Sequence, residues 1–171
     1  HAEEVGPDNL EDAVVYDRQE RFPDWKQEKI DSSSILVIGA GGLGSACVPQ
    51  FQRLGVGEFT LVDPDVVSIT NLNRQYYSLE QVGSSKVKAL GENMIRNSFK
   101  RITLHGFQTD IETVIELRKL ENNNTSLILC LVDNDETRYF VSEHLRQYPQ
   151  IHCGITENAE QGFVFIQTPH S

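Results

Sequence analysis

The chain of 171 residues has 39% hydrophobic and 23% charged residues, the composition of a globular domain and not of a disordered or fibrous chain. Its 15 basic and 25 acidic side chains give a net charge of −10, which disfavours tight nucleic-acid binding by the domain as a whole. No apolar run approaches the roughly 18 residues of a membrane-spanning helix, and no signal peptide is visible. We therefore expect a cytoplasmic protein without a membrane partner.

The three cysteines, Cys47, Cys130 and Cys153, are an odd number and form no CxxC pair. Cys130 and Cys153 lie in strand-like apolar runs. We expect all three to be reduced core residues in a reducing compartment, which excludes a disulfide scaffold. Because structural zinc sites use such cysteine pairs, no zinc is expected in this chain.

Residues 1–13 are acidic and aperiodic, so we expect a disordered or tag-derived N-terminus before a single domain over residues 14–171. Phe22 and Trp25 are the expected packing anchors at the start of that domain. Apolar runs typical of strands then alternate with amphipathic segments typical of helices. The expected strands are 35–38, 59–63, 102–107, 126–132, 151–155 and 163–167. The expected helices run from the glycines at 39–44 to about 54, and over 84–97, 111–120 and 136–147.

This alternation predicts an α/β fold, namely a Rossmann-like, doubly wound and mostly parallel sheet with a C-terminal antiparallel hairpin. The run 126–132 is continuously apolar, as strands buried on both faces are. Pro49 is expected to kink or shorten the first long helix. Ligands of such sheets bind beyond the carboxyl ends of the strands.

Two motifs predict a nucleotide at that end of the sheet. Gly39, Gly41 and Gly44 fit GxGxxG between a strand and a helix, where phosphates can approach backbone N–H groups. Asp63 ends the second strand, where a carboxylate can accept hydrogen bonds from ribose hydroxyls. The alternative for the glycines is a tight turn without a ligand, and the alternative for Asp63 is a helix-capping or turn aspartate. Up to this point an NAD-binding domain explains the pattern equally well.

The long connection 64–83 adds groups that NAD chemistry does not need. Asn71, Arg74 and Gln75 place two amides and a guanidinium beyond the nucleotide end of the sheet, and Lys86 follows them. Such groups suit an enzyme that attacks the α-phosphate of ATP, because negative charge develops there and on the departing pyrophosphate. The alternatives are a solvated polar loop and a surface lysine.

A carboxylate also closes the fourth strand. Asp133 faces the expected phosphates and is a candidate Mg²⁺ ligand, whereas Asp135 is expected to cap the following helix.

Five segments together resemble the adenylating domain of the ThiF/MoeB and ubiquitin-activating enzyme family. They are VIGAGGLGS (37–45), GVGEFTLVDPDVV (55–67), NLNRQ (71–75), VGSSK (82–86) and LVDNDETR (131–138). The resemblance covers roughly residues 16–168, nearly the whole chain.

The resemblance implies ATP and Mg²⁺ as cofactors and adenylation of the C-terminal glycine of a ubiquitin-like or sulfur-carrier protein that ends in Gly-Gly, with release of pyrophosphate. It implies that the glycines bind the nucleotide, that Asp63 holds the ribose and that Asp133 binds Mg²⁺. The implied nucleotide-binding residues are Gly39, Gly41, Gly42, Gly44, Asp63, Asn71, Arg74, Gln75 and Lys86. The implied catalytic residues are Arg74, Lys86, Asp133 and, from the partner of a homodimer, Arg18 of a YxRQ-like element.

Three features depart from the family pattern. The sequence stops at Ser171, where many relatives continue into zinc-binding cysteine pairs, so we expect a C-terminally truncated family domain without the carrier-docking half. No motif identifies any cysteine as a thioester-forming thiol. Pro49 interrupts the first helix, and Asn97-Ser98 replaces the usual Asn-Pro.

Three alternatives stay open. An NAD-dependent oxidoreductase domain would give Arg74 and Asp133 no role. A non-catalytic partner subunit of an activating enzyme would be expected to lack the phosphate and metal residues that this chain keeps. The branch of the fold that dehydrates a modified tRNA base is disfavoured by the net charge of −10.

Overall fold

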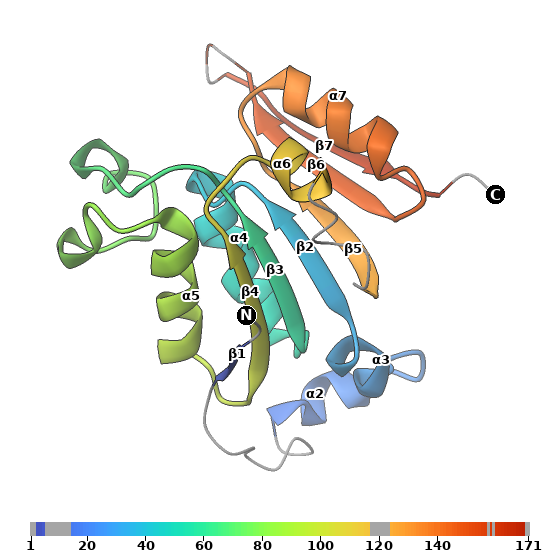
Figure 1. The fold of residues 1–171 in the computed structure, drawn as a ribbon. Helices are drawn as coiled ribbons and strands as arrows, with labels where there is room; N and C mark the ends of the chain where they lie inside the picture. Colours follow the sequence, from blue (N-terminus) through green and yellow to red (C-terminus); the bar gives the residue numbers. More distant parts are fainter. Residues whose placement is uncertain (1–2, 6–14, 117–123, 157, 159, 170–171) are drawn as a thin grey trace.

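The computed structural model of the chain describes residues 3–5, 15–116, 124–156, 158 and 160–169. In this part of the chain, seven strands form one sheet in the order β1-β4-β3-β2-β5-β6-β7 (Figure 1). The strands are β1 (Glu3–Val5), β2 (Ser34–Ile38), β3 (Glu58–Val62), β4 (Ile102–Phe107), β5 (Thr125–Cys130), β6 (Gln150–Ile155) and β7 (Gly162–Gln167). Strands β2 to β6 are parallel, and β7 pairs antiparallel with β6. The predicted doubly wound sheet with a C-terminal hairpin is confirmed.

Helices cover both faces of the sheet. They are α2 (Asp17–Glu20), α3 (Gln27–Asp31), α4 (Gly42–Arg53), α5 (Lys86–Arg96), α6 (Ile111–Glu116) and α7 (Asp135–His144). Alternate residues of β2 point to opposite faces: Ile35 and Val37 pack with α4 and α5, whereas Leu36 and Ile38 pack with α6 and α7. The core is therefore two apolar layers on either side of one sheet. No helix among the described residues is long and apolar enough to cross a membrane.

The first strand differs from the expectation for the N-terminus. Residues Glu3–Val5 lie in the segment 1–13, where we expected no regular structure, but they pair antiparallel with β4. This pairing satisfies backbone groups that the edge of β4 would otherwise leave open. The rest of that segment lies outside the described residues, as do residues 117–120 of the helix predicted over 111–120.

The prediction that Phe22 is a packing anchor is wrong. Its side chain is 66% exposed, whereas Tyr16 is fully buried. The Tyr16 ring packs edge-on against Phe99, with ring centroids 5.9 Å apart. Trp25 is half-buried, and its Nε1 donates to Gln27 Oε1 at 2.9 Å. Helices α2 and α3 thus lie at the amino ends of the parallel strands, opposite the glycine run (Figure 1).

Pro49 does not shorten its helix, because α4 continues through it to Arg53. A proline inside a helix costs about 3 kcal/mol, so packing must offset it. Val48 is fully buried before the proline, and buried Gln52 donates from Nε2 to the Met94 carbonyl of α5 at 2.8 Å after it. Tertiary contacts on both sides of Pro49 therefore hold α4 in place.

Candidate functional site

The glycine loop between β2 and α4 requires glycine at two positions for steric reasons. Gly39 has a φ of 100°, and a Cβ there would lie 2.9 Å from the Leu131 carbonyl carbon. A Cβ on Gly44 would lie 2.1 Å from the Gly39 oxygen. Gly44 therefore packs the helix closely against the loop, and it is not among the residues that line the cavity described next. Gly41 precedes α4 and offers no side-chain cap, so the first N–H groups of the helix stay available to an anion.

A cavity of about 570 Å³ lies at the carboxyl ends of the strands, as the fold predicts. It brings together nearly all of the predicted site. The predicted residues that line it are Gly39, Gly41, Gly42, Asp63, Asn71, Arg74, Gln75, Lys86 and Asp133. Only Gly44 and Arg18 of the predicted set are not among its lining residues. Residues that are far apart in the sequence thus share one cavity, and their roles there stay predictions.

Asp63 is buried at the floor of the cavity and is held by backbone donors. Its Oδ2 accepts from Ala40 N at 2.7 Å, and its Oδ1 accepts from Asp65 N at 2.8 Å. Burial raises the pKa of the Asp63 carboxyl above its usual value, although the two hydrogen bonds and the charge of Lys86 oppose this rise. Each carboxylate oxygen keeps a free lone pair, so Asp63 fits a pair of sugar hydroxyls.

Lys86 has a partner that the sequence analysis missed. Its ammonium lies 2.7 Å from Asp65 Oδ2, and the Lys86 side chain is only 9% exposed whereas that of Asp65 is 63% exposed. The Lys86 N–H also donates to the Asp65 carbonyl at 3.0 Å. The signal that could have revealed Asp65 is the Asp-Pro-Asp run at 63–65, directly after a buried strand.

The connection 64–83 contains two short helical turns, η1 (Ile69–Asn71) and η2 (Leu79–Gln81). Asn71 uses its Oδ1 to accept from Ser68 N at 3.0 Å, so part of its amide supports the loop itself. Arg74 is exposed, and its Nη1 donates to the Thr70 carbonyl at 2.8 Å. Gln75 is buried, and its Oε1 has no hydrogen-bond partner among the described residues. The amide of Gln75 therefore has unused hydrogen-bonding capacity at the cavity wall.

Tyr77 is a second residue that the sequence analysis missed. Its hydroxyl is buried and donates to the Ala40 carbonyl at 2.5 Å, which ties the glycine loop to the 64–83 connection. Burial, and then the negative charge of Asp63, raise the pKa of Tyr77, so the hydroxyl stays protonated. No pattern marks this tyrosine, because the aromatic pair at 76–77 stands in a polar run.

Asp133 and its neighbours divide their roles differently from the prediction. Asn134, not Asp135, caps α7, since its Oδ1 accepts from Thr137 N at 2.8 Å. Asp135 is instead the first residue of α7 and pairs with Arg138. Asp133 is exposed in the cavity. The Asp133 carboxylate therefore does not cap the helix.

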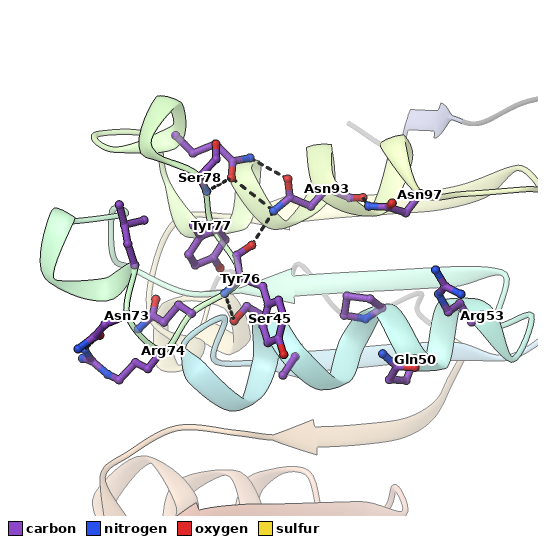
Figure 2. A pocket seen from close by; sticks show the side chains of 15 residues that line it. Ser45, Gln50, Arg53, Asn73, Arg74, Tyr76, Tyr77, Ser78, Asn93 and Asn97 are labelled. Carbon is purple, nitrogen blue, oxygen red and sulfur yellow. Dashed lines mark hydrogen bonds between the residues drawn. The ribbon is translucent and has the colours of Figure 1, made fainter.

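A second cavity, of about 760 Å³, lies between α4, α5 and residues 72–78 (Figure 2). It shares Arg74 and Gln75 with the first cavity, so these two residues form a common wall. Its far end is lined by Gln50 and Arg53 of α4 and by Asn97 after α5 (Figure 2). The sequence analysis did not predict this cavity.

Side chains of α4 and α5 bind the backbone of Tyr76 at the wall of the second cavity. The Tyr76 N–H donates to Ser45 Oγ at 3.1 Å, and Asn93 Nδ2 donates to the Tyr76 carbonyl at 2.9 Å (Figure 2). These bonds join the 72–78 segment to both α4 and α5. Tyr76 itself is 72% exposed.

Arg18 is not brought to either cavity. It is exposed on α2, at the amino ends of the strands (Figure 1), and it is not among the lining residues of either cavity. Within one chain, Arg18 therefore cannot act at the predicted nucleotide site.

The fold and the first cavity define a doubly wound α/β domain with a cavity at the carboxyl ends of its strands, where ligands of such sheets bind. The ThiF family model matches residues 16–171, and the chain belongs to the ThiF family. It is 30% identical over 154 residues to ubiquitin-like modifier-activating enzyme 5 of Xenopus laevis, covering 83% of this chain and 38% of the relative. It is 33% identical over 137 residues to adenylyltransferase and sulfurtransferase MOCS3 of Caenorhabditis briggsae, and the match covers 77% of this chain and 33% of the relative.

Solved structures share this fold. E. coli MccB, solved with AMPCPP and MccA, superposes with a TM-score of 0.80 at 19% identity, covering 97% of this chain and 52% of that one. PaaA gives a TM-score of 0.70 at 23% identity, and the match covers 86% of this chain and 52% of PaaA. The chain thus spans about a third of the length of the relatives above and about half of these structures.

Proposed function

We propose that this chain is an ATP-binding adenylation domain that activates the C-terminal glycine of a ubiquitin-like or sulfur-carrier protein ending in Gly-Gly. The observation that supports this proposal is the first cavity. It combines an uncapped helix start, the carboxylate of Asp63, the cations Arg74 and Lys86, and the exposed carboxylate of Asp133. A nicotinamide enzyme has no use for this combination. The printed names of the relatives, an activating enzyme and an adenylyltransferase, agree with it.

The proposed reaction needs positioning and charge stabilisation and no protein nucleophile. The terminal carboxylate of the carrier is already ionised, so its oxygen forms the bond to the α-phosphorus while the bond to the β-phosphate oxygen breaks and pyrophosphate leaves. Asp63 would hold the ribose, and the N–H groups before α4 would hold phosphate oxygens. Arg74 and Lys86 would stabilise the charge that develops on the phosphates.

The donors in the cavity fit Mg²⁺. This ion is bound in nucleotide sites by one or two carboxylates together with phosphates and waters. Asp133 supplies such a carboxylate, whereas no cluster of three or more His, Cys, Asp or Glu forms a complete cage among the described residues. When bound, Mg²⁺ would supply charge neutralisation on the phosphates.

We place the reaction in the reducing cytoplasm. The three cysteines are free, which agrees with a reducing compartment. Burial raises the pKa of the Cys130 thiol to about 11, so this thiol is not activated as a nucleophile.

The proposal includes a homodimer in which Arg18 acts on the partner's nucleotide. The second cavity supports this arrangement. Its lining residues Arg74 and Gln75 also line the nucleotide cavity. A second copy whose α2 entered the second cavity would therefore bring Arg18 next to the wall that the two cavities share.

The nucleotide proposal is tested by calorimetric titration with Mg·ATP and with NAD in parallel. We expect magnesium-dependent ATP binding and no NAD binding. Asp133→Ala and Arg74→Ala should remove carrier-dependent exchange of pyrophosphate into ATP, while the matched surface variants Glu136→Ala and Arg96→Ala keep it. Wild-type exchange in Asp133→Ala, or NAD binding alone, would overturn the proposal.

The role of Arg18 is tested by mixing two inactive variants, Arg18→Ala and Asp133→Ala. If Arg18 acts across a dimer, one intact site forms in each mixed dimer, and about a quarter of the wild-type exchange activity returns. If both variants stay inactive after mixing, Arg18 does not act in the partner's site.

A further inference from the structure

Arg138 of α7 lines the first cavity, and the proposed reaction does not use it. Its side chain is only 13% exposed. Its Nη2 donates to the Val132 carbonyl at 2.5 Å, and its Nη1 lies 2.5 Å from Asp135 Oδ1. One guanidinium therefore holds the chain on both sides of Asp133. Its Nε is buried and has no hydrogen-bond partner among the described residues, so the group is not a solvated surface charge.

The other side of Arg138 contacts the β6–β7 hairpin. The guanidinium carbon lies 5.0 Å from the centroid of the Phe163 ring on β7, within the range of a cation–π contact. Gly154 of β6 leaves the space for this stack, because a Cβ there would lie 2.5 Å from Arg138 Nη2 and 2.5 Å from the Phe163 ring. Gly154 and Phe163 are opposite each other in the hairpin register.

We infer that Arg138 is a positioning residue that fixes the 132–135 loop so that Asp133 presents its carboxylate to a divalent cation, and that Gly154 and Phe163 fix Arg138. This inference rests on the proposed function, since Asp133 is there the Mg²⁺ ligand. The physical reason is the geometry of the guanidinium, which is planar and has donors on opposite edges. A lysine carries the same charge but cannot bridge two acceptors in this way.

The inference predicts a loss of affinity for ATP that is confined to the magnesium-dependent part of binding. Residues that orient a metal ligand typically change metal affinity by about 10- to 100-fold when they are substituted. Arg138→Lys and Arg138→Ala should therefore weaken Mg²⁺-dependent binding of ATP by about tenfold or more. Binding of ATP in EDTA should change little, because the nucleotide contacts at the glycine loop and Asp63 stay in place.

Gly154→Ala provides an independent test, because it displaces Arg138 without removing it. It should reproduce the magnesium defect of Arg138→Lys, and the two substitutions together should be no worse than either alone. Arg146→Ala, an exposed arginine after the same helix, is the matched control and should bind as the wild type does. The midpoint of thermal unfolding of each variant shows whether it is folded. If Gly154→Ala does not fold, Arg138→Lys alone decides the question.

The measurement is calorimetric titration of ATP with Mg²⁺ and with EDTA. An equal loss of affinity in both conditions, or wild-type magnesium dependence in Arg138→Lys, would overturn the inference while the proposed function stands. If the wild-type chain binds ATP identically with and without Mg²⁺, the metal role of Asp133 fails, and the proposed function fails with it. Selective loss of the magnesium dependence in the Arg138 variants supports the inference.

Discussion

The glycine loop and the β6–β7 hairpin end at the same cavity, but they are stabilised in opposite ways. The glycine loop is enclosed by close backbone approaches, by Asp63 and by the buried hydroxyl of Tyr77. The hairpin exposes its apolar side chains, and Val164 and Ile166 are 69% and 66% exposed. The comparison teaches that the glycine-loop side of the cavity is held by contacts within this chain, whereas the hairpin side presents an apolar surface of the kind that marks interaction sites.

The largest expected effect lies in the glycine loop. Gly44→Ala would put a methyl group 2.1 Å from the Gly39 oxygen, so we expect a loss of at least about 2 kcal/mol in the free energy of unfolding. Gly42→Ala is the matched control, because its Cβ would lie at an ordinary 3.6 Å from the Arg74 oxygen. Urea unfolding measures both variants. Equal stability of the two would show that the loop relaxes easily, and the contrast with the hairpin would disappear.

A smaller effect is expected from the tyrosine that ties the loop to the 64–83 connection. Tyr77→Phe removes a buried hydrogen bond to Ala40 and leaves its carbonyl unsatisfied, which should cost about 1 kcal/mol in unfolding free energy. Tyr76→Phe changes its exposed neighbour and should change stability very little. If the two variants unfold at the same urea concentration, the hydroxyl of Tyr77 does not stabilise the loop.

The hairpin side should respond to pH. His152 of β6 is buried against Gln150, with Nε2 and Oε1 2.8 Å apart, and burial lowers the pKa of the imidazole from 6.5, with a further contribution from the charge of Arg138. Below pH 6.5 the unfolded chain therefore binds a proton that the folded chain excludes, so stability should fall as the pH drops below that value.

Urea unfolding between pH 7.5 and 5.5 checks this expectation, with His152→Gln compared with the wild type. The wild type should lose more stability than His152→Gln over this range, while the exposed His144→Gln should follow the wild type. Parallel pH profiles for all three proteins would rule out a role for His152.

The smallest effect is expected on the outer surface of the hairpin. Val164→Thr and Ile166→Thr remove exposed apolar groups, so the unfolding free energy should stay within about 0.5 kcal/mol of the wild type. A loss of several kcal/mol would show that these side chains are covered in solution. Light scattering on the same samples would then report whether a second copy covers them.

The predicted elements and most of the predicted site follow from local patterns. The glycine run, Asp63 and Lys86 stand directly at strand ends or helix starts, and parallel topology brings such positions to one edge. The close approach of Gly44 to the Gly39 carbonyl could not be predicted, because the sequence does not show which backbone atoms meet in the folded loop. The capping role was given to Asp135 instead of Asn134, since both residue types cap helices and the boundary decides between them.

Contacts between distant segments could not be predicted. Tyr77 reaches a carbonyl 37 residues away, and neither residue belongs to a motif. Arg138 and Gly154 meet only because β6 lies beside β5 in the sheet. Tyr16, rather than Phe22, anchors the N-terminal helices because Phe99 happens to lie beneath it. Such pairings depend on the completed fold and not on the spacing of residue types.

The Asp65–Lys86 ion pair has a consequence for how an anion reaches the cavity. The Lys86 ammonium lies 2.7 Å from Asp65 Oδ2, which offsets its charge. The outward electrostatic potential on this side of the cavity therefore depends on Arg74. Among the described residues that line the cavity, carboxylates outnumber cations by five to three, and the chain as a whole carries −10. A polyphosphate bound as proposed would therefore approach against a repulsive field, which ionic strength weakens. A divalent counterion that travels with it would lower the barrier to entry before any bond to the protein forms.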